Sequence, residues 1–341
     1  MDDDIRQLIQ LIHDSEGHAM LVTAGAGTQA LAWLLGVPGA SRTLLEAVVP
    51  YAQASFDDFL GQTPAKYVAA ETGRMMAGRA LSRAQWLQGE DAADEPTLIG
   101  LACTATIVTD RPKRGQHRAH IATWQPHAVH STYILLDKGH RDRKGEEGLV
   151  SRLMLNSLAR AYGLKQHLDL ALGEGDRLQS ERFDLQDSAE RLAQERITYI
   201  AVQADGRVTE DEGEAPLILS GSFNPLHQGH LDLARAAQAH LQQPLAFELA
   251  AHNVDKPPLP TAEVLQRMTQ FAGRWPIVVG NAPTFVEKSR LYPGATFVVG
   301  FDTAVRIIHP RYYGDSEAAM RQALADIDER GCRFLVAGRL G

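Results

Sequence analysis

The sequence predicts an α/β protein with two domains, and two observations support this fold class. Short apolar runs alternate with amphipathic segments of helical period along most of the chain. With 341 residues, the chain is also long enough for about two domains that each bury a core. We predict an N-terminal domain over 1–172, a connector over 173–215 and a C-terminal domain over 216–341.

The composition excludes several classes of protein. The formal net charge is −8, which argues against non-specific nucleic-acid binding, because phosphate backbones demand clustered Lys and Arg. No run approaches membrane-spanning length and no signal-peptide pattern follows Met1, so we expect a cytoplasmic protein without membrane contact. The two cysteines, Cys103 and Cys332, fall in different predicted domains, and we expect two buried thiols.

The N-terminal domain is expected to mix helices and strands. Apolar residues at helical spacing predict a first helix over 5–12, followed by a glycine-punctuated stretch at 24–27. Strands are expected at 98–102, 120–124 and 131–136, and a closing helix at 149–161. In the connector, the charged composition leaves a helix near 189–197 and a hairpin around 204–206.

The C-terminal domain is expected to be a Rossmann-like, doubly wound parallel sheet. From Pro216 onward, apolar strand candidates alternate with helical patterns, as that fold requires. The expected strands are 216–219, 245–249, 277–279, 296–299 and 334–336.

The segment 221–230 carries the most specific pattern, Gly-Ser-Phe-Asn-Pro-Leu-His-Gln-Gly-His, between a strand and a helix. Gly221 and Gly229 lack a Cβ, so the backbone can turn sharply and approach a ligand, while the N–H groups of the helix start favour an anion. His227 and His230 add imidazole donors. This set suits transfer at the α-phosphate of a nucleoside triphosphate, where charge grows on phosphate oxygens and no covalent intermediate is needed.

This motif resembles that of the nucleotidylyltransferase superfamily. The form Ser222-Phe223-Asn224 looks most like the nicotinamide and nicotinate mononucleotide adenylyltransferases, because other branches tend to carry Thr-Phe-Asp there. The resemblance implies that His227 and His230 are catalytic. It also implies nucleotide or phosphate binding by Gly221, Ser222, Phe223, Asn224 and Gly229.

The same resemblance assigns roles to two later segments. Lys256 lies in a Pro-rich loop after the second strand and would reach toward the phosphates, with a plain surface lysine as the alternative. Gly300 and Asp302 match a strand that ends in Gly-x-Asp, whose carboxylate accepts hydrogen bonds from ribose hydroxyls. The position of Asp302 suits a helix N-cap equally well.

Two departures from the family pattern leave questions open. The segment after Asp302 lacks the tryptophan pattern of the pyridine-recognising helix, so the acceptor is unsettled. The family's later Ile-Ser-Ser-Thr-x-x-Arg motif, which grips the triphosphate, does not occur before Gly341. We therefore expect a domain truncated at its C-terminus, or a triphosphate grip from Lys256, Arg306 or a second subunit.

The N-terminal half resembles the C-terminal domain of the competence-damage protein CinA, a family that deamidates nicotinamide mononucleotide. The resemblance rests on 37–42 (Val-Pro-Gly-Ala-Ser-Arg) and 48–51 (Val-Val-Pro-Tyr), and it runs to about Leu172. It implies a deamidase site whose serine and lysine are replaced, and hence inactive. The four positions of this degenerate site are Ala24, Tyr51, Phe56 and Thr104, of which Ala24 and Phe56 are the replacements.

Two alternatives concern the same half. A working site rebuilt from Thr23, Thr28 or Ser55 stays open. Histidines also recur within strand-like sequence, with i,i+3 spacing that places each pair on opposite faces, so we expect no metal site there. These histidines are His117, His120, His127 and His130.

The expected reaction joins nicotinamide or nicotinate mononucleotide to ATP and releases pyrophosphate, with Mg²⁺ carried by the triphosphate. The alternatives are another phosphorylated acceptor, CTP as the donor, or a non-catalytic protein that binds nucleotides. Partners are expected to be small-molecule nucleotides, and the CinA resemblance suggests a homo-oligomer formed through the N-terminal domain.

Overall fold

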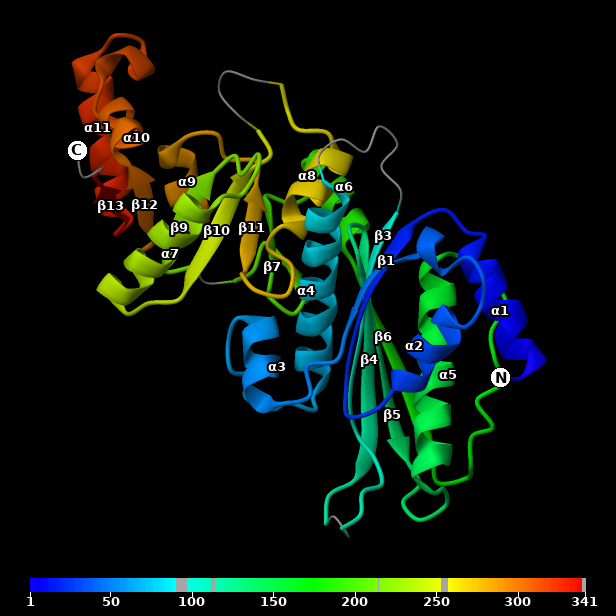
Figure 1. Ribbon diagram of the computed structural model, residues 1–341. Coiled ribbons are helices and arrows are strands. Elements are labelled where there is room, and N and C mark those ends of the chain that lie inside the picture. The colour runs from blue at the N-terminus through cyan, green and yellow to red at the C-terminus, as the bar shows by residue number, and fades with distance from the viewer. Residues whose placement is uncertain (90–96, 112–113, 214, 253–256, 339–341) are drawn as a thin grey trace. The chain divides into compact units, whose positions relative to one another are not determined.

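A computed structural model describes residues 1–89, 97–111, 114–213, 215–252 and 257–338 (Figure 1). The chain forms two compact units. The first unit comprises Met1–Leu185 together with the short segments Ala204–Arg207 and Phe271–Arg274. The second unit comprises Gln186–Gln203, Val208–Gln270 and Trp275–Gly341. The predicted two-domain α/β class is confirmed.

The first unit is built on a mixed sheet in the order β2-β1-β3-β4-β5-β6. β2, β1 and β3 run parallel, and β4, β5 and β6 continue the sheet antiparallel. The strands are β1 (His18–Ala24), β2 (Leu44–Val48), β3 (Leu98–Thr106), β4 (His117–Gln125), β5 (Ala128–Leu136) and β6 (Arg177–Asp184). The helices are α1 (Asp3–His13), α2 (Thr28–Leu35), η1 (Ala40–Arg42), α3 (Gln53–Leu60), α4 (Ala70–Gln88) and α5 (Arg143–Ala161).

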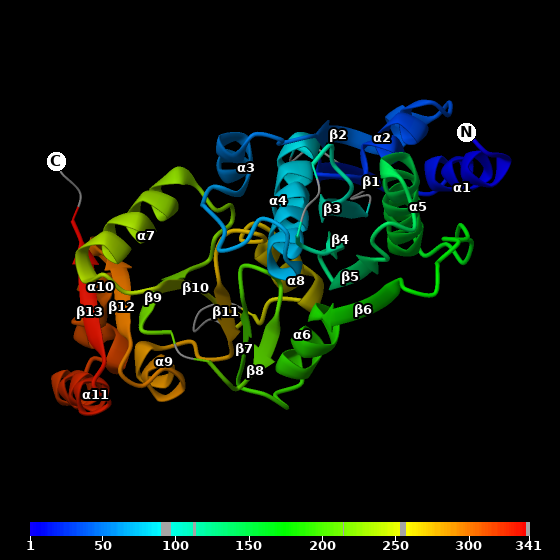
Figure 2. The same ribbon diagram turned by 90° about the horizontal axis from the view of Figure 1, so that it is seen from below.

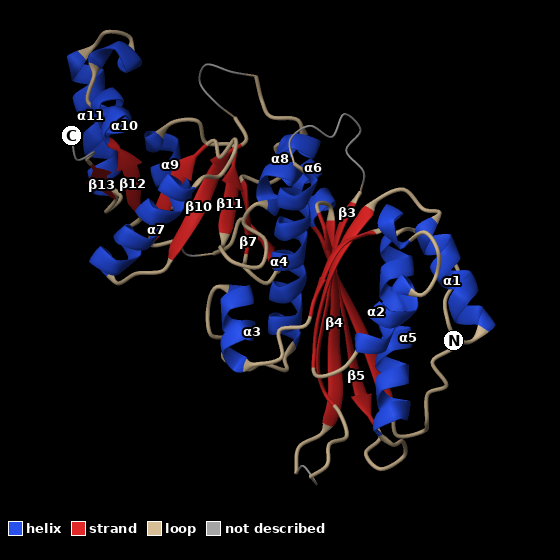
Figure 3. Ribbon diagram, in the orientation of Figure 1, coloured by secondary structure: helices blue, strands red, loops and turns tan. Residues whose placement is uncertain are grey.

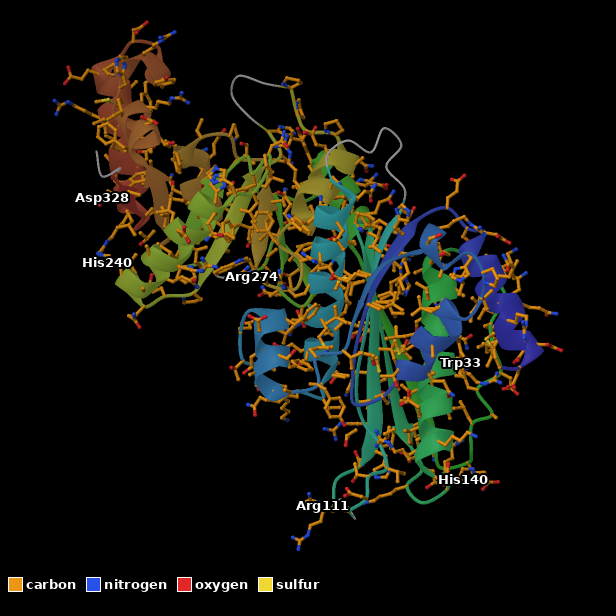
Figure 4. All side chains as sticks on the ribbon, in the orientation of Figure 1. Trp33, Arg111, His140, His240, Arg274 and Asp328 are labelled. Atoms are coloured by element: carbon orange, nitrogen blue, oxygen red, sulfur yellow. The ribbon has the colours of Figure 1, made fainter. Side chains whose placement is uncertain are left out.

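Helices cover both faces of this sheet, with α4 on one face and α5 on the other (Figure 2). α4 comes close because β3 has Gly100 beneath it, where a Cβ would lie 2.0 Å from the Ala77 carbonyl oxygen. On the opposite face, α1, α2 and α5 share one apolar core with the strands. Trp33 of α2 packs at the border of that core (Figure 4).

The second unit is built on a sheet in the order β13-β12-β9-β10-β11-β7-β8. Its strands are β7 (Tyr199–Val202), β8 (Val208–Glu210), β9 (Leu217–Gly221), β10 (Leu245–Ala250), β11 (Ile277–Gly280), β12 (Thr296–Gly300) and β13 (Arg333–Ala337). Its helices are α6 (Leu185–Ala193), α7 (Gln228–Leu241), α8 (Thr261–Thr269), α9 (Phe285–Leu291), α10 (Phe301–Ile307), η2 (Pro310–Tyr313) and α11 (Glu317–Glu329).

The strands from β9 onward form the parallel, doubly wound part of this sheet. From β9 the chain proceeds to β10 and β11 on one side and then to β12 and β13 on the other (Figure 3). α7 lies on one face, and α9 and α11 share a core with the opposite face. The order therefore reverses between β9 and β12, which is where open α/β sheets bind ligands.

The prediction of a connector over 173–215 needs a correction, because residues of this segment complete both sheets. β6 pairs with β5 at the edge of the first sheet, and β7 and β8 pair antiparallel at the edge of the second. β6 is exposed along most of its length, so it lacks the apolar alternation that marks a half-buried strand. The predicted hairpin at 204–206 is confirmed as the β7–β8 turn, whereas the helix predicted near 189–197 begins earlier, at Leu185.

The prediction of two buried thiols is confirmed. Cys103 and Cys332 are both buried free thiols, one in each unit. No helix within the described residues combines the length and the apolar character needed to cross a membrane.

Candidate functional site

The predicted Gly-Ser-Phe-Asn-Pro-Leu-His-Gln-Gly-His segment forms the turn from β9 into α7. β9 ends at Gly221 and α7 begins at Gln228, with His227 as its N-cap residue. β12, the neighbour of β9 across the switch point, ends at Gly300 and leads into α10. The carboxyl ends of β9 and β12 thus bring the histidine motif and the Gly300–Asp302 segment to the same edge of the sheet.

The two motif histidines lie against each other at the start of α7. Their rings stack with centroids 3.7 Å apart and an angle of 23° between the ring planes. The backbone N–H of His227 donates to Nδ1 of His230 across 3.3 Å. Because Nδ1 of His230 accepts this bond, the neutral ring carries its proton on Nε2 and can donate from that atom.

Burial lowers the pKa of His230, and the nearby His227 lowers it further. His230 is therefore neutral near pH 7 and presents a single, oriented N–H donor. The first turn of α7 contains no acidic side chain. Free helix N–H groups and imidazole donors without a competing carboxylate form a site suited to a phosphate group.

Phe223 anchors the turn from inside the unit. Phe223 is 1% exposed and has a backbone φ of +45°. Its ring lies edge-on to the rings of His230 and Phe247, with centroids 5.1 and 5.4 Å away. A Cβ on Gly221 would lie 2.7 Å from the Phe223 ring, which explains the glycine at that position. The Phe223 side chain thus shapes the turn from within, while Ser222 and Asn224 are exposed.

Gly229 lies at a second close approach, because a Cβ there would lie 3.2 Å from the His227 ring. Asp302 is exposed in the first turn of α10, whose N-cap is Gly300, so the N-cap alternative for Asp302 is wrong. Its carboxylate thus remains available for a ligand. Lys256 lies outside the described residues.

Two side chains that sequence reasoning missed hold the motif turn. Arg267 of α8 donates from Nη1 to the Ser222 carbonyl oxygen at 2.8 Å. Gln270, directly after α8, accepts from the Leu226 N–H at 2.6 Å and donates to the Phe223 carbonyl oxygen at 2.9 Å. No local sequence signal marks them, because they act about forty-five residues beyond the turn.

The degenerate deamidase positions are only partly brought together in the first unit. Ala24 and Thr104 are cross-strand partners on β1 and β3. Phe56 is buried against Tyr67, with ring centroids 5.1 Å apart, and the Thr104 hydroxyl donates to the Tyr67 carbonyl oxygen at 2.6 Å. Tyr51 is 74% exposed.

The hydroxyls proposed to rebuild that site already have partners, or lie on the surface. Thr23 is buried and donates to the Ala26 carbonyl oxygen. Thr28 donates to Glu147 at 3.0 Å. The same Glu147 oxygen accepts from the N–H groups of Gly27 and Gln29 at 3.0 Å each, so a carboxylate of the chain itself caps the start of α2. Ser55 is exposed.

Two of the four histidines considered from the sequence, His117 and His120, have different surroundings in the first unit. His117 is buried and lies 2.8 Å from Glu146 of α5. His120 is buried on the α4 side, stacked on Tyr133 at 4.9 Å. The described residues contain no group of three or more His, Cys, Asp or Glu side chains placed to hold a metal ion.

Comparison with known families identifies the class of the second unit. Residues 218–338 match the family described as cytidylyltransferase-like. This region is therefore a nucleotidyltransferase-like domain, which confirms the superfamily expected from the histidine motif. No curated protein matches the chain.

Solved structures similar to the N-terminal region come from the competence-damage group. One is the competence/damage inducible protein CihA from Agrobacterium tumefaciens, at 19% identity and a TM-score of 0.35, covering 47% of this chain and 97% of that chain. Another is a CinA superfamily protein from Escherichia coli, at 18% identity and a TM-score of 0.32, covering 47% and 92%. A third, from Enterobacter cloacae, has 15% identity and a TM-score of 0.33, covering 47% and 90%.

Proposed function

We propose that the second unit transfers the adenylyl group of ATP to the phosphate of nicotinamide or nicotinate mononucleotide. The observation that carries this proposal is the pair of stacked histidines at the N-terminus of α7, in which His230 accepts at Nδ1 and so keeps its proton on Nε2. An acceptor phosphate oxygen attacks the α-phosphorus, the bond to the bridging oxygen breaks, and pyrophosphate leaves. Oriented N–H donors stabilise the charge that develops on these oxygens.

Other residues have supporting roles in this proposal. Gly221 and Gly229 let the backbone approach the phosphates, and Ser222 and Asn224 lie exposed beside them. Asp302 accepts hydrogen bonds from ribose hydroxyls, and Lys256 reaches the phosphates. Mg²⁺ arrives with the triphosphate, because this ion commonly keeps waters and substrate oxygens as ligands. A cytoplasmic location is part of this proposal.

The test is product analysis with the purified protein and Mg²⁺. ATP is paired in turn with nicotinamide and nicotinate mononucleotide, and dinucleotide and pyrophosphate are measured. Formation of dinucleotide and pyrophosphate in equal amounts supports the proposal. If ATP binds in calorimetry but no dinucleotide forms with either acceptor, the acceptor assignment is wrong.

CTP is a second candidate donor, favoured by the cytidylyltransferase-like family that residues 218–338 match. Replacing ATP by CTP in the same assay, with a panel of phosphorylated acceptors, separates the two. Pyrophosphate release with CTP, but not with ATP, favours CTP as the donor. If no nucleotide is turned over but one binds tightly, the domain is a nucleotide-binding module.

For the first unit, we propose a CinA-like domain without deamidase activity. Ala24 and Phe56 offer neither a nucleophile nor a proton carrier, and the Thr23 and Thr28 hydroxyls already have acceptors within the unit. Incubation with nicotinamide mononucleotide should release no ammonia. Release that a Thr28→Val variant abolishes would overturn this proposal.

A further inference from the structure

The carboxyl end of α8 grips the motif turn at three backbone atoms. Arg267 binds the Ser222 carbonyl, and Gln270 joins the Phe223 carbonyl to the Leu226 N–H. These atoms lie in the stretch of chain between the end of β9 and the histidine N-cap of α7. The turn has few other anchors in this stretch, where Ser222, Asn224 and Pro225 are exposed.

Packing alone does not require a guanidinium at this place. The Arg267 side chain is only 12% exposed. Its Nη2 pairs with Glu263 one turn earlier on α8, with i,i+4 spacing, and its Nε is buried with no hydrogen-bond partner among the described residues. A buried, incompletely bonded cation contributes little to stability, and an apolar residue of similar volume often serves as well. The side chain is therefore better explained by the contact it makes with the turn.

Gln270 has a complementary geometry. Its side-chain amide donates to the Phe223 carbonyl and accepts from the Leu226 N–H, three residues later in the turn. The amide therefore fixes the distance between these two backbone groups. The Phe223 ring at one end of this bridge contacts His230, and His227 follows Leu226 at the other end. The bridge therefore ties together two backbone positions next to the imidazoles.

We infer that Arg267 and Gln270 are positioning residues, which hold the turn so that His227 and His230 meet the α-phosphate. This inference rests on the proposed function of the second unit. The side chains act on the backbone of the turn, so their loss should lower kcat far more than it raises KM for ATP. A misplacement of about 1 Å can cost about 100-fold in rate.

The experiment compares Arg267→Met, Gln270→Met and Gln270→Glu with the wild type. Gln270→Glu keeps the acceptor for Leu226 but loses the donor to Phe223, so it should fall between the wild type and Gln270→Met. The matched control is Arg321→Met, which breaks an exposed Arg–Glu pair with the same i,i+4 spacing on α11. We expect kcat to fall about 10- to 100-fold in the two Met variants, with little change in the control.

Two readouts separate positioning from plain stability. Thermal unfolding should leave Arg267→Met close to the wild type, and NMR titration should show the His230 pKa rising toward its ordinary value as the turn opens. Unchanged kcat in both Met variants would overturn the inference. If the wild type itself has no turnover, the proposed function fails separately, and an unchanged His230 titration in Gln270→Met then overturns the positioning role.

Discussion

The β1–α2 turn of the first unit and the β9–α7 turn of the second share a local design but differ in what meets the helix N-terminus. Each leads from the carboxyl end of an inner strand, through glycines, into a helix. At α2, the Glu147 carboxylate accepts from two backbone N–H groups. At α7, the first turn carries no acid, and two imidazoles lie there instead.

This difference shows that turns of the same local design can either hold an anion of the chain itself or leave the helix N-terminus without one. A helix N-terminus attracts any anion, including a carboxylate of the same chain. Glu147 supplies that anion to α2, and Ala24, the predicted nucleophile position, ends the strand before this turn. In the β9–α7 turn no acidic residue lies in the first helical turn, and we propose that its donors meet an external phosphate. We therefore propose that the first turn has lost its chemistry, while the second carries groups suited to phosphate transfer.

The largest expected effect is the loss of the His230 donor. His230→Ala should lower kcat about 100- to 1000-fold, since a donor aimed at developing charge contributes about that much. ATP affinity measured by calorimetry should change much less. His240→Ala is the control, because His240 lies in the last turn of the same helix (Figure 4). Equal kcat in the wild type and His230→Ala would remove the catalytic distinction between the turns.

The next largest effects are expected from glycine substitutions, which should lower stability at the first turn and turnover at the second. At Gly25, φ is +90° and a Cβ would lie 2.0 Å from the Ala105 carbonyl oxygen, so Gly25→Ala should destabilise the protein by about 3 kcal/mol or more. Gly229 has a Cβ clearance of 3.2 Å from the flexible His227 ring. Gly229→Ala should therefore spare stability and lower turnover. Denaturant unfolding with a parallel turnover assay measures both, and similar unfolding free energies would contradict the comparison.

How far the sequence predicted the molecule depends on the range of the interactions involved. The β9–α7 turn was predictable because glycines, histidines and a helical pattern lie within ten residues. Arg267 and Gln270 were not, since they reach the turn only after α8 folds back over it. Glu147 caps a turn 120 residues earlier in the chain. No local pattern carries such contacts.

The same argument explains the errors in the fold. β10 and β12 were predictable because buried strands in a parallel sheet are apolar along their length. β6 was interpreted as part of a connector because an exposed edge strand has no apolar face to reveal it. Its place is set by pairing with β5, which is a tertiary contact.

Removing Glu147 should convert the filled turn into an open one. Glu147→Ala leaves the N–H groups of Gly27 and Gln29 without their acceptor and should cost about 1–2 kcal/mol of stability, as loss of a helix cap does. Inorganic phosphate should then raise the Tm of this variant more than that of the wild type. Glu16→Ala, an exposed loss of the same charge, is the control. An identical response to phosphate in all three proteins would show that the turn offers no anion site.

The last expected effect is a pH dependence in the stability of the first unit. Burial lowers the pKa of His120 to about 4 from its ordinary 6.5, with Arg118 and Arg74 adding to the shift. The unfolded chain binds a proton below about pH 6.5. The folded unit does so only near 4, so this part of its stability is complete above 6.5 and is lost as the pH falls toward 4.

His120→Phe removes the titrating group and keeps a ring against Tyr133, so the midpoint of urea unfolding should depend less steeply on pH between 6.5 and 4. His240→Ala, an exposed histidine of the second unit, should leave the slope unchanged. If His120→Phe unfolds with the slope of the wild type, the acid sensitivity belongs to other buried histidines, of which His13 is the first to test because its pKa is also lowered by burial.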